Sequence, residues 1–379
     1  MKATILFSLL LTRAFCQLGI SQDKLPIIHA TTNLVDIRDG NEFSKGEWTL
    51  ALEYKPDVYT SGKIGETVTF YTDVDSISCV VHPDSVFDFI ILLNGKDSAY
   101  TQIKYAPTYL DVLKGAKDYN YNDAAAIPEF TYQDSSHTAL KTLRKELNLD
   151  SIAGGGNEVS RILNLLHWIQ DLIPHDGNHE NPIIKNAMSM INQCKQEERG
   201  LNCRGLATVL NECYLSLGIK SRFITCMPKD SVFDDCHVIN MVYSNDLQKW
   251  VWIDPTNDAY IMDETGMLIG LEEVRERLIN GKMLILNPDA NWNHKSSTLK
   301  EYYLFEYMAK NLYRFECPLN SEYNYETWEK GKIVEYVELI PLDGFKQEPK
   351  SSVSTNEKTE VTFKNYKTNN PDFFWTKPE

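Results

Sequence analysis

The centre of this 379-residue chain carries the run Asn202-Cys203-Arg204-Gly205-Leu206-Ala207-Thr208-Val209-Leu210. From Cys203 onward, apolar residues recur at the three- and four-residue steps of one helix face: Leu206, Leu210, Cys213 and Leu217. Gly218 stands where the C-terminal cap of such a helix would fall. The charged segment before the run ends in Gly200 and is typical of a loop. Cys203 is therefore predicted to begin a buried helix.

A cysteine at the start of a helix can be reactive. The first N–H groups of a helix lack backbone partners, and the helix dipole favours an anion there. Both effects stabilise a thiolate, which is the nucleophilic form of cysteine. The alternative is an inert core thiol, because free cysteine is also a common buried residue. The position of Cys203 allows reactivity without requiring it.

Two strand-like segments downstream, His237–Tyr243 and Lys249–Asp254, supply a base and a group to orient it. A symmetric hairpin with its turn at residues 244–247 places His237 directly opposite Asp254, with Cβ atoms about 5 Å apart on one face. A slip of one residue would separate the two side chains. Cys203 as nucleophile, His237 as base and Asp254 as its orienting partner then form a coherent catalytic set.

Acyl chemistry at Cys203 also needs hydrogen-bond donors for the oxyanion. The backbone N–H of Cys203 is one such donor, because it lies at a helix start. The second donor stays open between Asn202 and His175. Arg204 and Trp252 are candidates for substrate contact. The other interpretation is that Arg204 covers the helix start and that Trp252 belongs to the core or the cleft wall.

The cysteine segment, from Cys203-Arg204-Gly205-Leu206-Ala207 to Ser221-Arg222, resembles the cysteine motif of the transglutaminase-like superfamily. His237-Val238 and the segment from Trp250 to Thr256 resemble the histidine and aspartate motifs of that family, in the family's order. The resemblance covers about residues 155–260. It implies an α+β, papain-like core with the cysteine helix packed on an antiparallel sheet. It also implies that Cys203, His237 and Asp254 are a catalytic triad.

Composition limits the partners. The formal net charge is −15 and the pI is about 5.1, which argues against a nucleic-acid ligand, since phosphate binding needs a basic face. His175, Asp176 and His179 suggest a metal cluster, but no further ligand follows at a defined spacing. Neither a metal nor another cofactor is predicted.

The N-terminus has the features of an export signal. Lys2 precedes an apolar run that is too short to span a bilayer, and residues 14–16 offer a cleavage site. Residues 1–16 are therefore predicted to be a signal peptide, and a lipoprotein anchored through Cys16 is less favoured because bulky Phe15 precedes it. We expect an exported protein that is periplasmic, secreted or on the cell surface. The absence of Asn-x-Ser/Thr sequons favours a bacterial source. No other segment has transmembrane length.

The pattern along the chain predicts several parts. Residues 25–110 form a β-rich accessory domain, with a turn at Asn94-Gly95, and a glycan- or peptide-binding face is the alternative role for it. Residues 111–134 form a linker and residues 135–300 the catalytic core. Residues 301–379 form a β-rich extension that completes or flanks the core, with strand-like runs at 302–305 and 333–339.

The sequence thus predicts a cysteine enzyme that acts on amide bonds of peptides or of glutamine side chains through a thioester. The substrate is a peptide, a protein or a cell-wall peptide. Hydrolysis is favoured over transfer to an amine, because water is always available outside the cell and transfer needs a site that excludes it. The alternative is a non-enzymatic binding protein on the same fold.

Overall fold

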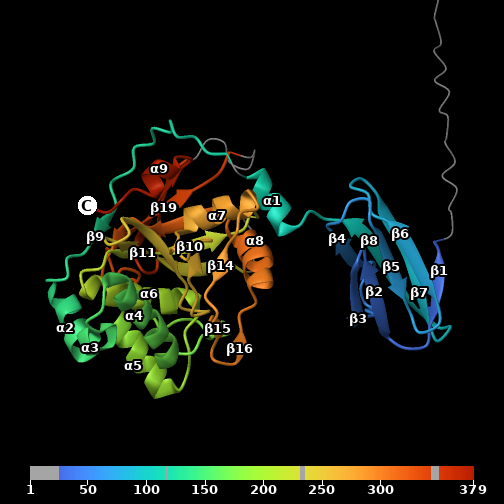
Figure 1. The fold of residues 1–379 in the computed structure, drawn as a ribbon, viewed down its shortest axis with the longest axis horizontal. Helices are drawn as coiled ribbons and strands as arrows, with labels where there is room; N and C mark the ends of the chain where they lie inside the picture. Colours follow the sequence, from blue (N-terminus) through green and yellow to red (C-terminus); the bar gives the residue numbers. More distant parts are fainter. Residues whose placement is uncertain (1–24, 117, 231–234, 343–349) are drawn as a thin grey trace, which may run out of the picture. The chain divides into compact units, whose positions relative to one another are not determined.

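The computed structural model describes residues 25–116, 118–230, 235–342 and 350–379. The chain divides into two compact units, the first ending at Pro107 and the second running from Thr108 to Glu379 (Figure 1). The predicted signal peptide at 1–16, with Cys16, lies outside the described residues. No helix in the described ranges is long and apolar enough to cross a membrane.

The first unit consists of two four-stranded sheets. One has the order β1 (Ile27–Ala30), β7 (Val86–Leu93), β8 (Asp97–Tyr105) and β4 (Asp57–Ser61). The other has the order β3 (Glu42–Thr49), β2 (Leu34–Asp39), β5 (Thr67–Tyr71) and β6 (Ser76–Val80). Fully buried Phe70 and Phe89 meet edge-to-face at 5.4 Å, and they anchor the core of the unit. The predicted turn at Asn94-Gly95 is confirmed, because both residues have left-handed φ between β7 and β8.

The second unit is built on a seven-stranded sheet. Its order is β12 (Lys249–Ile253), β11 (His237–Ser244), β10 (Ser221–Met227), β17 (Arg314–Pro318), β19 (Ile333–Leu339), β21 (Thr362–Thr368) and β20 (Ser352–Thr355). All neighbours are antiparallel except β19 and β21. The strands after residue 300 therefore continue the sheet that carries His237, since β17 pairs directly with β10.

One face of this sheet is covered by a helical layer that includes the cysteine helix. The layer contains α2 (Thr138–Glu146), α3 (Leu149–Ala153), α4 (Glu158–Leu172), α5 (Ala187–Glu197) and α6 (Cys203–Ser216). Nearly every position of α6 from Gly205 onward is buried, because the sheet lies on one side of it and helices α2, α4 and α5 on the others (Figure 1). Helix α4 is capped at its start, since the Asn157 side chain accepts a hydrogen bond from the N–H of Ser160.

The other face packs against α7 (Leu271–Ile279), η1 (Glu301–Met308), α8 (Ala309–Asn311), α1 (Tyr109–Gly115) and α9 (Pro371–Phe374). Strand β11 shows why both layers are needed. Ile239 and Met241 are buried toward this second layer, whereas Val242 is buried toward the cysteine helix layer. A strand buried on both faces is apolar at successive positions, as here.

The prediction of a strand at residues 302–305 is wrong, because this segment belongs to η1, a π-helix. Tyr303, Leu304 and Met308 are buried from one side of that helix, so tertiary packing overrides the strand preference of aromatic residues. The strand expected at 333–339 is confirmed as β19.

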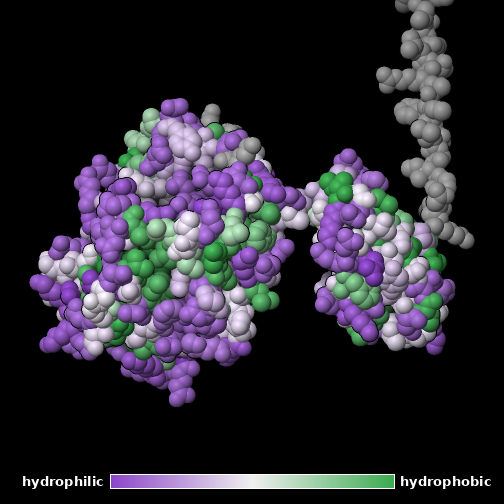
Figure 2. Space-filling model, viewed as in Figure 1, coloured by the Kyte–Doolittle hydropathy of each residue, from purple (hydrophilic) through white to green (hydrophobic). Residues whose placement is uncertain are grey.

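Three short strand pairs complete the second unit. They are β9 (Thr131–Tyr132) with β18 (Asn320–Ser321), β13 (Ile261–Met262) with β14 (Ile285–Leu286), and β15 (Asn291–Trp292) with β16 (Ser296–Ser297). The stretch 111–134, expected as a linker, lies within this unit, where Leu113 and Ala116 are fully buried. The surface in Figure 2 is mainly hydrophilic on both units, as the acidic composition leads us to expect.

Candidate active site

Cys203 is the first residue of α6, as the helix pattern predicts. Asn202 is its N-cap, and the Oδ1 of Asn202 accepts from the N–H of Gly205 at 3.2 Å. The amide of Asn181 holds this cap, since its Nδ2 donates to Asn202 Oδ1 at 2.7 Å and its Oδ1 accepts from Asn202 N at 3.1 Å. The cap fixes the helix start and leaves Cys203 half-buried, packed against Phe223 of β10 and Val238 of β11.

Gly205 is required by this arrangement. A Cβ at Gly205 would lie 2.5 Å from Oδ1 of Asn181, a distance that real Cβ atoms do not reach. The glycine therefore lets Asn181 approach the first turn of α6 and hold its cap.

His237 and Asp254 meet, although the hairpin register differs from the prediction. Tyr243 pairs with Trp250 and Met241 with Trp252, which shifts the register by two residues from the expected one. His237 is therefore diagonal to Asp254 and not directly opposite it. A shift of two keeps every side chain on its own face, because side chains alternate with period two. Diagonal neighbours remain within reach of a histidine, and His237 Nε2 lies 2.8 Å from Asp254 Oδ2.

The two side chains are almost completely buried, at 1% exposure for His237 and 0% for Asp254. Burial opposes a charged His237, but the Asp254 carboxylate beside it raises the pKa of His237 to about 10. Burial likewise opposes a charged Asp254, but His237 and the hydrogen bonds around the carboxylate lower its pKa. The pair is therefore an imidazolium and a carboxylate at neutral pH.

The sequence reasoning missed three groups that hold the Asp254 carboxylate. The Tyr303 hydroxyl donates to Oδ2 at 2.6 Å, Asn257 Nδ2 donates to Oδ2 at 3.0 Å, and the N–H of Thr256 donates to Oδ1 at 2.9 Å. Tyr307 is a fourth missed residue, and its hydroxyl lies 3.4 Å from His237 Nδ1. Tyr303 and Tyr307 stand four apart, so helical spacing would have placed them on one face.

The thiol of Cys203 is held in its ionised form. Burial raises its pKa, but hydrogen bonds with the His175 and His237 side chains and the charge of His237 lower the pKa of Cys203 to about 6. Burial instead raises the pKa of the Cys213, Cys226 and Cys317 thiols. Of the cysteines that the structure describes, Cys203 is the one whose pKa is lowered, and its thiol is hydrogen-bonded to the histidine of the buried His237–Asp254 pair.

Cys203 and His237 line a cleft of about 690 Å³. His175, Asn202 and Arg204 line it as well. Other lining residues come from the β15–β16 hairpin, from η1 and from the segment between them, and they include several exposed apolar side chains: Trp292, Leu299 and Tyr302. The thiolate is therefore open to a ligand, while its histidine and aspartate are shielded from water.

The family model of the transglutaminase-like superfamily matches residues 145–255. Residues 145–255 are a transglutaminase-like domain. This range includes Cys203, His237 and Asp254. The α+β fold class with a transglutaminase-like core, expected from the sequence, is confirmed. A transglutaminase-like domain with this thiol supports a cysteine peptidase- or amidase-like enzyme.

Among solved structures, a "Putative Cysteine Protease" from Cytophaga hutchinsonii is similar to the chain, with 18% identity and a TM-score of 0.25. The similarity covers 34% of this chain and 40% of that one. A comparison with curated proteins gave no match.

The remaining predicted site residues have different surroundings in the transglutaminase-like domain. Asn202 uses its side-chain oxygen to cap α6. Arg204 lines the cleft but is held by Glu326 through Nε and Nη2, at 2.9 and 2.7 Å. Trp252, a candidate for substrate contact with the core or the cleft wall as the alternative, is fully buried against Tyr303 and lies outside the cleft lining, so it belongs to the core. No group of three His, Cys, Asp or Glu side chains in the described ranges is placed to hold a metal ion.

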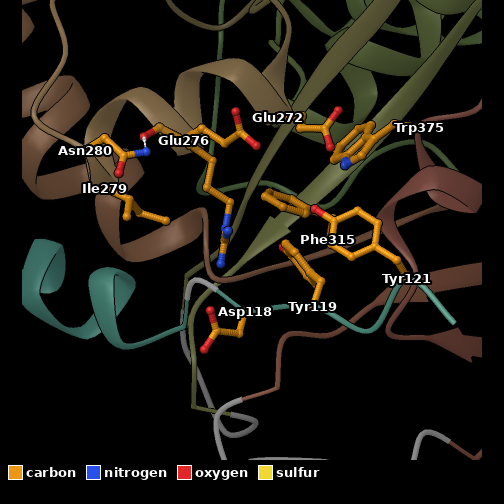
Figure 3. A pocket seen from close by; sticks show the side chains of 10 residues that line it. Asp118, Tyr119, Tyr121, Glu272, Glu276, Ile279, Asn280, Phe315 and Trp375 are labelled. Atoms are coloured by element: carbon orange, nitrogen blue, oxygen red, sulfur yellow. Dashed lines mark hydrogen bonds between the residues drawn. The ribbon is translucent and has the colours of Figure 1, made fainter. Parts of the chain in front are cut away.

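A second cavity of the same unit, of about 370 Å³, lies between α7 and side chains from residues 118–121, from β17 and from the C-terminal segment at Trp375 (Figure 3). Aromatic rings group on one side of it, and Glu272 and Glu276 of α7 line another (Figure 3). Burial raises the pKa of Glu272 to about 7. Buried Arg275 donates to the carbonyl groups of Leu312 and Ala116. The cavity lining contains no cysteine or serine nucleophile, so the cleft at Cys203 is the better candidate for catalysis.

Proposed function

We propose that this protein is a cysteine enzyme that hydrolyses amide bonds of peptides or proteins through a thioester on Cys203. The main support is the position of the Cys203 thiol at a helix start, where it is hydrogen-bonded to His237. The Nε2 of His237 lies 2.8 Å from the carboxylate of buried Asp254. The transglutaminase-like domain around these residues supports the same chemistry.

In the first half of the proposed reaction, the Cys203 thiolate attacks the carbonyl carbon of the amide. The carbonyl oxygen becomes an oxyanion, which accepts a hydrogen bond from the backbone N–H of Cys203. His237 then gives its proton to the amide nitrogen and the C–N bond breaks. The amine leaves, and the acyl group stays on Cys203 as a thioester. Asp254 holds the imidazole in place and stabilises its charged form.

In the second half, water attacks the thioester carbon. Neutral His237 takes a proton from this water, the C–S bond breaks, and the acid and the Cys203 thiolate are released. The imidazolium is thereby restored. The proposed cycle needs no metal or organic cofactor.

Exposed cleft walls support hydrolysis over transfer to an amine. Leu299 and Tyr302 are 68% and 65% exposed, so water reaches the site from this side. Amine transfer requires that water be kept from the thioester. The signal-like N-terminus supports an exported enzyme, whose substrate would be a peptide, a protein or a cell-wall peptide.

Mass spectrometry of peptide and cell-wall peptide libraries tests the proposal. The libraries are incubated with wild type, with Cys203→Ala and with Cys79→Ala, which removes a thiol from the first unit. Wild type and Cys79→Ala are expected to give products heavier by one water in total, and Cys203→Ala none. Joined chains with loss of ammonia would show transamidation instead. Equal results for wild type and Cys203→Ala would refute an enzyme and favour a binding protein.

A further inference from the structure

His175 and His237 both hydrogen-bond to the thiol of Cys203. Each ring has a second hydrogen-bond partner, and these two partners differ. His237 has a carboxylate at Nε2, whereas the Nδ1 of His175 lies 3.2 Å from the indole Nε1 of Trp292. A carboxylate can only accept a hydrogen bond, and an indole N–H can only donate one. The two imidazoles are therefore oriented by groups of opposite kind.

The indole determines where the proton of His175 lies. Because Trp292 Nε1 donates to Nδ1, this nitrogen must be the acceptor and carries no proton. The single proton of the neutral ring is then on Nε2, the nitrogen left for the hydrogen bond between His175 and Cys203. His175 cannot take a proton from the thiol with a nitrogen that already carries one.

The backbone of His175 is fixed by the same hairpin. Asn293 accepts from the N–H of His175 at 2.6 Å and donates to its carbonyl oxygen at 2.8 Å. Asn293 and His294 both adopt left-handed φ in the tight turn after β15, which aims Trp292 and Asn293 at the same residue. The β15–β16 hairpin therefore holds the main chain and the ring of His175 together.

We infer that Trp292 is a positioning residue that fixes the Nε2–H tautomer of His175, so that His175 is a side-chain donor to Cys203 and to the oxyanion. The role toward the oxyanion rests on the proposed function, but the tautomer does not. His175 thus becomes the second oxyanion donor, beside the backbone N–H of Cys203, and His237 the proton carrier.

Imidazole nitrogen spectra of the full chain test the tautomer directly. Two-bond proton–nitrogen correlations distinguish a protonated ring nitrogen from an unprotonated one, and the His175 signals are assigned by their loss in His175→Gln. Wild type is expected to show unprotonated Nδ1 and protonated Nε2. Trp292→Phe, which keeps a ring but loses the donor, is expected to show both tautomers. Trp328→Phe is the matched control, since Trp328 is 50% exposed and outside the cleft lining. A protonated Nδ1 in wild type, or an unchanged pattern in Trp292→Phe, would overturn the inference.

Alkylation of Cys203 by iodoacetamide at pH 6 gives a second readout. Trp292→Phe is expected to slow it about three- to ten-fold, the effect of weakening one hydrogen bond to the thiolate. In the His175→Gln background, Trp292→Phe should have no further effect, because an amide donor has no tautomer to fix. If Trp292→Phe instead slows alkylation by the same factor in the wild-type and His175→Gln backgrounds, Trp292 acts only by supporting the hairpin, and the inference is refuted. If wild-type Cys203 reacts no faster than Cys213, the proposed function fails; fast alkylation with a protonated Nδ1 refutes only the role of Trp292.

Discussion

Cys203 and His237 carry opposite charges because each stabilises the other against the cost of burial. Asp254 would be a buried charge without an opposite charge if His237 were absent. Three neutral donors, from Thr256, Asn257 and Tyr303, also hydrogen-bond to its carboxylate oxygens. Removing any one member leaves the others with unpaired charge at partly or fully buried positions. The set is therefore expected to respond sharply to pH and to single substitutions.

The alkylation rate of Cys203 is expected to rise as pH increases through about 6, and then to level off. A lowered pKa means that the thiolate persists down to about pH 6 and is protonated below it, where the rate falls about ten-fold per pH unit. Iodoacetamide labelling on both sides of this pH, followed by peptide mass spectrometry, measures the profile. Buried Cys213 serves as the internal control. A half-maximal rate near pH 9, the ordinary value for a thiol, would contradict the ion pair.

Tyr303→Phe is expected to weaken the site without unfolding the protein. The substitution removes the hydroxyl that donates to Asp254 Oδ2 at 2.6 Å, while the donors from His237 and Asn257 stay, and loss of one hydrogen bond to a charged group costs about 1.5–3 kcal/mol. Thermal unfolding should move to lower temperature, and Cys203 alkylation at pH 6 should slow. Tyr121→Phe, at a residue that is 56% exposed, is the control. Equal melting temperatures for the two variants would show that the Tyr303 hydroxyl is dispensable.

The secondary-structure elements that position the site were predictable from sequence to different degrees. Helix α6 begins at Cys203 because its apolar steps, its cap and its terminal glycine all agree. The hairpin could be predicted but its register could not, since the loop is formed by residues 245–248 and Gln248 takes left-handed φ, for which glutamine gives no signal. Helix η1 was missed because aromatic residues with strand preference are helical only through their packing against the sheet and Asp254.

Gly205→Ala is expected to disturb the start of α6 despite the higher helix propensity of alanine. The added Cβ would collide with the Asn181 amide that holds the Asn202 cap, and such overpacking costs about 1–3 kcal/mol. Gly115→Ala is the matched control, because Gly115 is also helical, has open space around it, and should gain stability by less than about 1 kcal/mol. Urea unfolding of both variants measures the difference. A Gly205→Ala variant as stable as Gly115→Ala would show that Asn181 can move aside at little cost.

The whole second unit depends on strands that come late in the chain. Four of the seven strands in its sheet lie after residue 300, and η1, which supplies Tyr303 to Asp254, lies there too. The family match ends at residue 255, so it covers the cysteine helix and the hairpin but not this half of the sheet. Sequence similarity therefore covers the predicted site residues Cys203, His237 and Asp254 without showing what completes the core around them.

A chain of residues 108–379 is accordingly expected to fold and to keep a reactive Cys203, because every cleft residue and the core around the site lie within these bounds. A chain of residues 108–300 is expected to stay unfolded, since β10 loses its partner β17 and the second layer loses Leu304, Met308 and Phe315 from its core. Circular dichroism melting and pH-dependent alkylation of Cys203, compared with the full chain, measure both outcomes. Cooperative melting of residues 108–300 with wild-type alkylation would show that the late strands flank the core without completing it. Failure of residues 108–379 to fold would show that the first unit contributes to its stability.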